Sequence, residues 1–169
     1  MIDRRQLFTT GVALGALTLA TKFSQAGVTM TDTTTAPATD FQKLSDAEWR
    51  QRLTPQQYDI LRKHGTERAG TSPLNHEKRK GTFACAGCDL PLFSSDTKFE
   101  SGTGWPSFYA ALPGALGTKT DMKMIVPRTE YHCARCDGHQ GHVFDDGPAP
   151  TGKRYCNNGV ALKFVLVAA

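Results

Sequence analysis

The sequence lacks a long apolar run, has little net charge of one sign and contains few cysteines. Its weakly apolar stretch from Leu7 to Thr21 holds about 15 residues, whereas a membrane-spanning helix needs roughly 20. We therefore expect no stable membrane span once the chain has been processed. The formal net charge is only +4, whereas nucleic-acid binding favours a clustered basic face, so no nucleic-acid partner is expected.

The composition is that of an ordinary globular protein. Hydrophobic residues make up 39% and charged residues 21% of the 169 positions, unlike the low-hydrophobicity, high-charge composition of disordered chains. A chain of this length fits one domain with an appendage, since single domains commonly hold roughly 100–200 residues.

The N-terminal residues 1–26 show the three parts of a secretory signal peptide. The pair Arg4-Arg5 comes first, the apolar stretch follows, and small residues close the segment. The run from Asp3 to Phe8 resembles the twin-arginine export signal, so we expect a periplasmic or otherwise exported protein. The alternatives are an amphipathic N-terminal helix and an uncleaved anchor.

A polar run of Thr, Asp, Ala and Pro occupies residues 27–40 and shows no apolar period. Such a composition buries too little surface to order itself, so we interpret this run as a flexible linker. Residues 41–169 then form the folded domain.

Two short helices are expected at the start of this domain. Ser45 with Glu48, and Thr54 with Gln57, both match the capping box that begins a helix. The second helix should end near Gly65, because glycine commonly follows the last turn.

After Gly81 the pattern changes to short β-rich runs separated by Gly and Pro. No repeating βα unit is evident, which argues against a parallel sheet. We predict a mainly β, α+β fold, with an antiparallel sheet preceded by short helices. The expected strands are Thr82 to Cys85, Leu90 to Phe93, Met122 to Val126, Glu130 to Cys133, His142 to Phe144 and Ala161 to Val167.

Four of the five cysteines form two Cys-x-x-Cys pairs, Cys85 with Cys88 and Cys133 with Cys136. Two such pairs supply the four thiolates of a closed tetrahedral zinc site, which would hold the fold together because no coordination position stays open. Two disulfides or two redox-active pairs are the alternative in an exported protein. We favour one structural zinc ion per chain, because a redox pair usually occurs once beside a βαβ unit.

The fifth cysteine, Cys156, is then left without a partner. Arg154 lies two residues earlier and would project to the same side of a strand, where its charge favours the reactive thiolate. A buried inert thiol beside a surface ion pair explains the spacing equally well.

Several further motifs occur in order with the two cysteine pairs and resemble the signatures of the peptide methionine-R-sulfoxide reductases of the B type. The resemblance covers the chain from about Asp40 to its end. The motifs are Ser101-Gly102-Thr103-Gly104-Trp105-Pro106-Ser107-Phe108, Gly138-His139-Gln140-Gly141-His142-Val143-Phe144-Asp145-Asp146-Gly147-Pro148 and Arg154-Tyr155-Cys156-Asn157-Asn158.

The resemblance implies a reductase that converts the R form of peptide-bound methionine sulfoxide to methionine and so repairs oxidised proteins. Cys156 would attack the sulfoxide sulfur and become a sulfenic acid. His142 would donate a proton to the oxygen, and His139 would bind and orient the substrate. The substrates would be oxidised proteins or peptides, and a thioredoxin-like or other thiol reductant would regenerate the enzyme.

Other residues of these motifs would complete the site. Asp146 would hold Arg154 or an imidazole, and Asn158 would form a hydrogen bond near the sulfoxide oxygen. Trp105 would offer a flat face to the S-methyl group, with Phe108 as a second wall.

The chain departs from the family pattern at three positions. Thr103 stands where many members carry a second cysteine, so the sulfenic acid at Cys156 would need an external thiol. Asp145 replaces a usual proline, and Gly159 replaces a usual serine, which should loosen the loop after Asn158. Two rival functions are a non-catalytic zinc module that binds a protein, and a thiol oxidoreductase with redox-active cysteine pairs.

Overall fold

The computed structural model of the chain describes residues 39–123 and 126–167. The signal peptide expected at residues 1–26 lies outside these ranges, as does the expected linker apart from its last two residues. The description below therefore concerns the domain that begins after the linker.

Both predicted helices are present, and their ends are set by local hydrogen bonds. Helix α1 spans Asp46–Arg52 and α2 spans Pro55–Lys63, and each begins with a complete capping box. His64 is the C-terminal cap of α2 and adopts a left-handed conformation with φ 57° and ψ 38°. Short 3-10 turns lie at Phe41–Lys43, Pro73–His76, Ser95–Thr97 and Gly159–Ala161.

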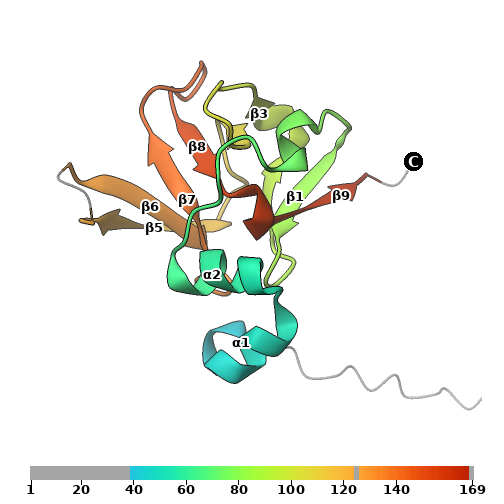
Figure 1. The fold of residues 1–169 in the computed structure, drawn as a ribbon. Coiled ribbons are helices and arrows are strands. Elements are labelled where there is room, and N and C mark those ends of the chain that lie inside the picture. The colour runs from blue at the N-terminus through green and yellow to red at the C-terminus, as the bar shows by residue number, and fades with distance from the viewer. Residues whose placement is uncertain (1–38, 124–125, 168–169) are drawn as a thin grey trace, which may run out of the picture. The chain divides into compact units, whose positions relative to one another are not determined.

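Nine antiparallel strands in the described residues form two sheets, which confirms the predicted fold class (Figure 1). The first sheet has the order β2 (Pro91–Ser94), β1 (Gly81–Cys85) and β9 (Leu162–Leu166). The second has the order β3 (Lys98–Phe99), β4 (Ser107–Phe108), β8 (Arg154–Asn157), β7 (His139–Phe144), β6 (Arg128–Cys133) and β5 (Leu116–Asp121).

One predicted strand is wrong. Met122, Lys123 and Val126 do not belong to a strand, and the strand at this place is the preceding segment, Leu116–Asp121. The apolar residues misled the prediction, because Met122 and Val126 are 69% and 70% exposed. Strand β5 is mostly polar because it lies at the sheet edge, where pairing with β6 stabilises its backbone without burying its side chains.

The core lies between the two sheets and continues under the helices. Aromatic rings from both sheets meet there: Phe93 of β2 stacks on Phe108 of β4 with ring centroids 4.2 Å apart, and Phe83 of β1 contacts the same ring edge-on. Trp49 of α1 is 2% exposed and extends this core toward the cysteine pairs. The core therefore holds the two sheets in a fixed relation, on which the site depends.

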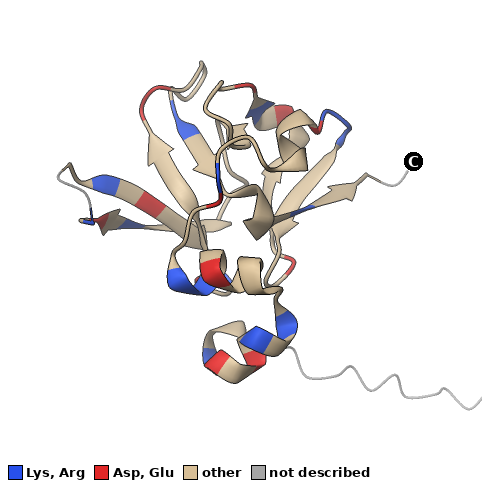
Figure 2. Ribbon diagram, viewed as in Figure 1, with Lys and Arg blue, Asp and Glu red and all other residues tan. Residues whose placement is uncertain are grey.

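The charged residues are distributed over helices, strands and turns, with both signs mixed along the chain (Figure 2). None of the described helices has the length and apolar character that crossing a membrane requires.

Candidate active site and four-cysteine centre

Strand β8 places Cys156 between two neighbouring strands. Cys156 pairs with Ser107 of β4 on one side and with His142 of β7 on the other. Directly paired residues of antiparallel strands project from the same face of the sheet. Strand pairing therefore brings His142 next to Cys156, although the two residues are 14 positions apart in the chain.

The two central strands approach closely at this point because β7 carries a glycine. A Cβ atom at Gly141 would overlap the carbonyl oxygen of Cys156. Any larger residue at position 141 would push β7 away from β8, and the His142 imidazole would move with it.

A pocket of about 130 Å³ opens over Cys156 and His142. Its two aromatic walls are Trp105 and Phe144. The remaining lining residues are Thr66, Arg128, Gly141, Asn157 and Asn158.

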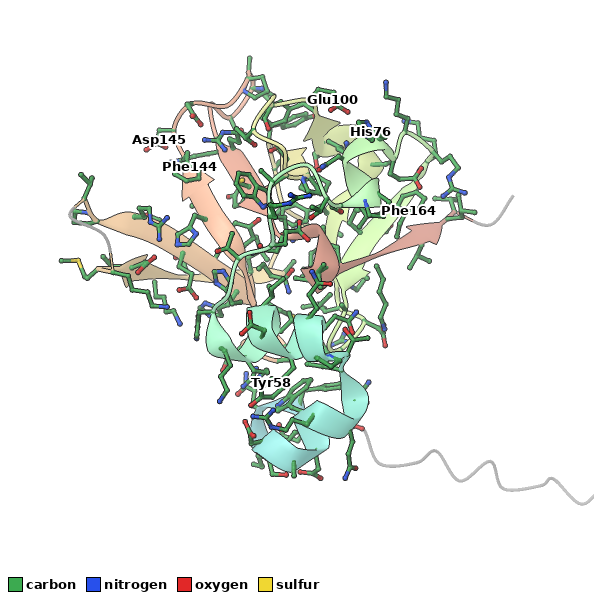
Figure 3. The ribbon with its side chains drawn as sticks, viewed as in Figure 1. Tyr58, His76, Glu100, Phe144, Asp145 and Phe164 are labelled. Carbon is green, nitrogen blue, oxygen red and sulfur yellow. The ribbon has the colours of Figure 1, made fainter. Side chains whose placement is uncertain are left out.

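The structure corrects the prediction for Phe108, which does not line this pocket. Phe108 pairs with Tyr155, and the neighbouring Ser107 pairs with Cys156, so the two residues of β4 project from opposite faces. The Phe108 ring is 0% exposed and belongs to the core. The second aromatic wall is Phe144, which pairs with Arg154 in the β7–β8 ladder and lies at the upper left of Figure 3.

Burial raises the pKa of the Cys156 thiol above its ordinary value, while the charge of Arg154 and the Thr103 hydroxyl act in the opposite direction. The guanidinium of Arg154 is itself held by Asp146 through two hydrogen bonds of 2.8 Å. Asp146 thus contacts Arg154, as expected. The charge of Arg154 lowers the pKa of Cys156, as the sequence suggested, but burial raises this pKa by more.

His142 lies in a network that the sequence did not reveal. Its Nε2 atom is 2.8 Å from Oδ2 of Asp121, and Arg128 donates to the same oxygen at 2.7 Å. The N–H of Lys123, with His142 and Arg128, holds the pKa of Asp121 well below its usual range. Asp121 is therefore a carboxylate that orients His142 in the pocket.

His139 lies behind His142, with ring centroids 5.6 Å apart, and is not among the pocket-lining residues. Strict alternation would place residues three apart on opposite faces of a strand. A register shift in the β6–β7 ladder interrupts that alternation, and the His139 Nδ1 atom lies 3.0 Å from Glu130, the residue that pairs with His142. Burial lowers the pKa of His139 to about 4.

Asn158 lies at the pocket edge with both polar atoms of its side chain engaged. Its Oδ1 accepts from the Glu67 N–H at 3.0 Å, and its Nδ2 donates to the Gln140 carbonyl at 3.0 Å. The Glu67 carboxylate accepts the N–H groups of Gly159 and Val160. Gly159, at which a looser loop is expected from the sequence, is buried and its backbone N–H donates to Glu67.

Glu67 also positions Trp105, whose indole N–H donates to the Glu67 carbonyl at 3.2 Å. Glu67, which follows α2 in the chain, therefore holds both Trp105 and Asn158. Sequence reasoning missed Glu67, Asp121 and Arg128, because none belongs to a recognisable local pattern and the site residues that Glu67 and Asp121 contact are distant in the chain.

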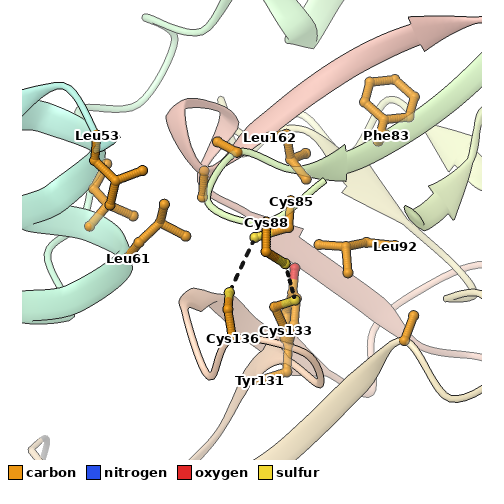
Figure 4. Close-up of a cluster of buried hydrophobic side chains, with 14 of the residues drawn as sticks. Leu53, Leu61, Phe83, Cys85, Cys88, Leu92, Tyr131, Cys133, Cys136 and Leu162 are labelled. Atoms are coloured by element: carbon orange, nitrogen blue, oxygen red, sulfur yellow. Dashed lines mark hydrogen bonds between the residues drawn. The ribbon is translucent and has the colours of Figure 1, made fainter. Parts of the chain in front are cut away.

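The four sulfurs of Cys85, Cys88, Cys133 and Cys136 lie within 4.8 Å of one another. The distance is 3.6 Å between the sulfurs of Cys85 and Cys136, and 3.4 Å between those of Cys88 and Cys133 (Figure 4). Tetrahedral zinc with Zn–S bonds of about 2.3 Å separates its sulfurs by about 3.8 Å, whereas a disulfide needs about 2.05 Å. The cluster fits a zinc ion and is not disulfide-bonded.

Arginines surround this cluster and bind the backbone of its two turns. Arg52 donates to the Gly87 carbonyl, Arg62 to the Cys136 carbonyl and Arg135 to the Cys88 carbonyl. Four thiolates around one Zn²⁺ carry a net charge of about −2, and these three positive charges offset it. The surroundings therefore favour thiolates at this place.

Comparison with known proteins matches the model of the SelR domain to residues 53–166 of the chain. The chain belongs to the SelR-domain family. The matched residues include both cysteine pairs, the pocket and all nine of the strands described above.

Curated members of this family resemble the chain closely. It is 54% identical over 129 residues to peptide methionine sulfoxide reductase B1, chloroplastic, of Arabidopsis thaliana; the match covers 76% of this chain and 64% of that relative. It is 55% identical over 121 residues to peptide methionine sulfoxide reductase MsrB of Agrobacterium fabrum, covering 71% of this chain and 90% of the relative. The MsrB of Methanosarcina barkeri is 54% identical over 121 residues, with 71% and 85% covered.

Proposed function

We propose that the chain reduces the R form of peptide-bound methionine sulfoxide to methionine, with Cys156 as the nucleophile. Family membership supports the general activity, an oxidoreductase that reduces methionine sulfoxide and repairs oxidised protein. The observation that carries the assignment to Cys156 is its direct pairing with His142 under a pocket with two aromatic walls.

In the proposed reaction, oxygen passes from the substrate sulfur to the Cys156 sulfur. Cys156 attacks the sulfoxide sulfur while His142 gives a proton to the oxygen, and the thiol proton of Cys156 restores the imidazole. The sulfoxide S–O bond breaks, and Cys156 ends as a sulfenic acid. The substrate sulfur gains two electrons and the cysteine sulfur loses two, so the step needs no other reactant.

The pocket walls account for recognition. Trp105 and Phe144 offer apolar surface to the S-methyl group. His142 lies beside Cys156, so the sulfoxide oxygen must point toward one side of the attacked sulfur. A sulfoxide of the opposite configuration cannot place its methyl group and its oxygen in these positions together, which favours one configuration.

Regeneration requires a thiol from outside the chain. The other four cysteines lie in the zinc-type cluster, which leaves no thiol to attack the sulfenic acid. A thioredoxin-like protein or another thiol reductant would form a mixed disulfide with Cys156 and release water, and a second thiol would then free Cys156. The four-cysteine cluster would hold one structural zinc ion, whose four thiolate ligands leave it no open position for substrate.

A single turnover without reductant tests the proposal. The wild type should release about one methionine per enzyme from the R sulfoxide and none from the S sulfoxide, and dimedone should label Cys156. The separate R and S sulfoxides of a blocked methionine serve as substrates, and peptide mapping locates the label. Equal turnover of both forms would contradict the assignment.

The Thr103→Cys variant sharpens this test. The Thr103 hydroxyl lies close enough to lower the pKa of Cys156, so a thiol there should capture the sulfenic acid. After one turnover this variant should carry a disulfide between positions 103 and 156 and lose dimedone labelling. Continued labelling without a disulfide would contradict a sulfenic acid that faces residue 103.

Asp121→Asn should lower kcat at least about tenfold with little change in KM, because the variant loses the carboxylate that orients the proton donor His142. Asp145→Asn is the matched control, since Asp145 contacts Lys153 at the protein surface. Steady-state kinetics of both variants, with melting temperatures to confirm folding, make the comparison. An unchanged kcat for Asp121→Asn would contradict a role for Asp121 in orienting His142.

The proposal includes export through the twin-arginine route, supported by the Arg4-Arg5 pair before a weakly apolar stretch. Changing both arginines to lysine should trap the precursor inside the cell, because this route reads the arginine pair itself. Cell fractionation with an antibody to the domain measures the distribution. Normal export of the double variant would point to another pathway.

A further inference from the structure

A second cluster of metal-ligating groups lies behind the pocket, apart from the four cysteines. It consists of His64 at the end of α2, Glu130 in β6 and His139 in β7. One ligand atom of each residue lies within 4.8 Å of the other two. From this cluster we infer a site for a first-row divalent transition-metal ion.

The distances suit a metal ion. The Nδ1 atoms of His64 and His139 each lie 3.0 Å from the same oxygen of Glu130. Metal–ligand bonds of about 2.0–2.2 Å with angles of about 90–110° separate neighbouring ligand atoms by about 3.0–3.4 Å. Two imidazoles and one carboxylate are a ligand set that zinc and other first-row divalent ions accept, with positions left for water.

His139 supplies an independent sign of a ligand. Its Nδ1 atom is buried and makes no hydrogen bond within residues 39–123 and 126–167, although it lies 3.0 Å from a Glu130 oxygen. The side chain is only 2% exposed. A buried imidazole nitrogen without a hydrogen-bond partner is a candidate ligand for a cation.

An ion can reach this place from solvent. A groove lined by His64, Lys119, Asp121 and Glu130, among others, opens beside the cluster. The Lys119 ammonium lies 3.2 Å from the Glu130 carboxylate and so offers a competing positive charge. Its side chain is 49% exposed, which lets it turn into solvent when an ion enters.

An ion held there would link three segments that are distant in sequence. It would tie the end of α2 to β6 and β7, the strands that also carry Arg128 and His142. The site is separate from the cysteine cluster, so the two ions should be distinguishable by ligand chemistry.

The test is calorimetric titration of Zn²⁺ into full-length protein that already holds one zinc at the cysteine cluster. The Cys156→Ser background removes the free thiol as a competing ligand. One additional Zn²⁺ should bind per chain. His64→Asn should weaken it at least about tenfold, because one imidazole ligand is lost while asparagine still tolerates the left-handed backbone.

Two further variants complete the design. Lys119→Met should tighten binding of the second ion, because it removes the competing charge at an exposed position where folding is not at risk. His76→Asn is the matched control, since His76 lies in a 3-10 turn away from α2 (Figure 3), and it should bind as the wild type does. The inference is overturned by a protein that takes up no second ion, by equal affinity in His64→Asn, or by unchanged affinity in Lys119→Met.

Discussion

Cys156→Ser should abolish reduction of the R sulfoxide, a loss of at least about 1000-fold in kcat/KM, while zinc content and melting temperature stay close to the wild type. A serine hydroxyl is a poor nucleophile toward sulfur, and the remaining four cysteines lie together in the buried cluster. Turnover of the separate R and S sulfoxides, with metal analysis of the same preparation, measures both parts of the expectation.

The fold itself predicts that this substitution is tolerated. Cys156 lies in the pocket and is only partly buried, so replacing sulfur by oxygen changes little of the core. A wild-type disulfide between Cys156 and one of the cluster cysteines, found by peptide mapping, would contradict both the single-cysteine mechanism and the closed zinc site.

Cys133→Ser should produce a protein without zinc that does not unfold cooperatively. Cys85 ends β1 of the three-stranded sheet and Cys88 follows it, whereas Cys133 ends β6 of the six-stranded sheet and Cys136 follows it. The cluster therefore joins the two sheets. Structural zinc binding is worth about 10–16 kcal/mol, which is comparable with the whole stability of a domain, about 5–15 kcal/mol. The free energy lost with one zinc ligand should therefore exceed the stability that the hydrophobic core alone provides.

Metal analysis and thermal unfolding followed by circular dichroism check this expectation. Cys156→Ser is the matched control, because it makes the same chemical change outside the cluster and should retain one zinc per chain. Purified wild type without zinc, with its four cluster thiols in disulfides, would refute the zinc assignment.

Features carried by neighbouring residues could be predicted from the sequence. The capping boxes at Ser45 and Thr54 set the starts of both helices, because the cap and its partner are three residues apart. The clustering of the four cysteines could be predicted, since each pair has the spacing of a metal-binding turn. The ordered motifs indicated the family, which the comparison confirms.

The tertiary structure decided which side chains share a face. Phe108 is only three residues after Trp105 in sequence, yet strand register turns its ring into the core, and Phe144 forms the second aromatic wall in its place. His139 shares a face with Glu130 only because the register of the β6–β7 ladder shifts between Tyr131 and His132. Strand alternation is local, but the register that orients it depends on partners far along the chain.

The residues that support the site could not be predicted from the sequence either. Glu67 holds Asn158 and the loop after it across more than 90 positions, and Asp121 contacts His142 across 21. The sequence by itself determined the chemical groups, the helix starts and the pairing of the cysteines, because these depend on near neighbours. Only the tertiary structure decided which carboxylates and aromatic rings surround Cys156, because long-range strand pairing and core packing select them.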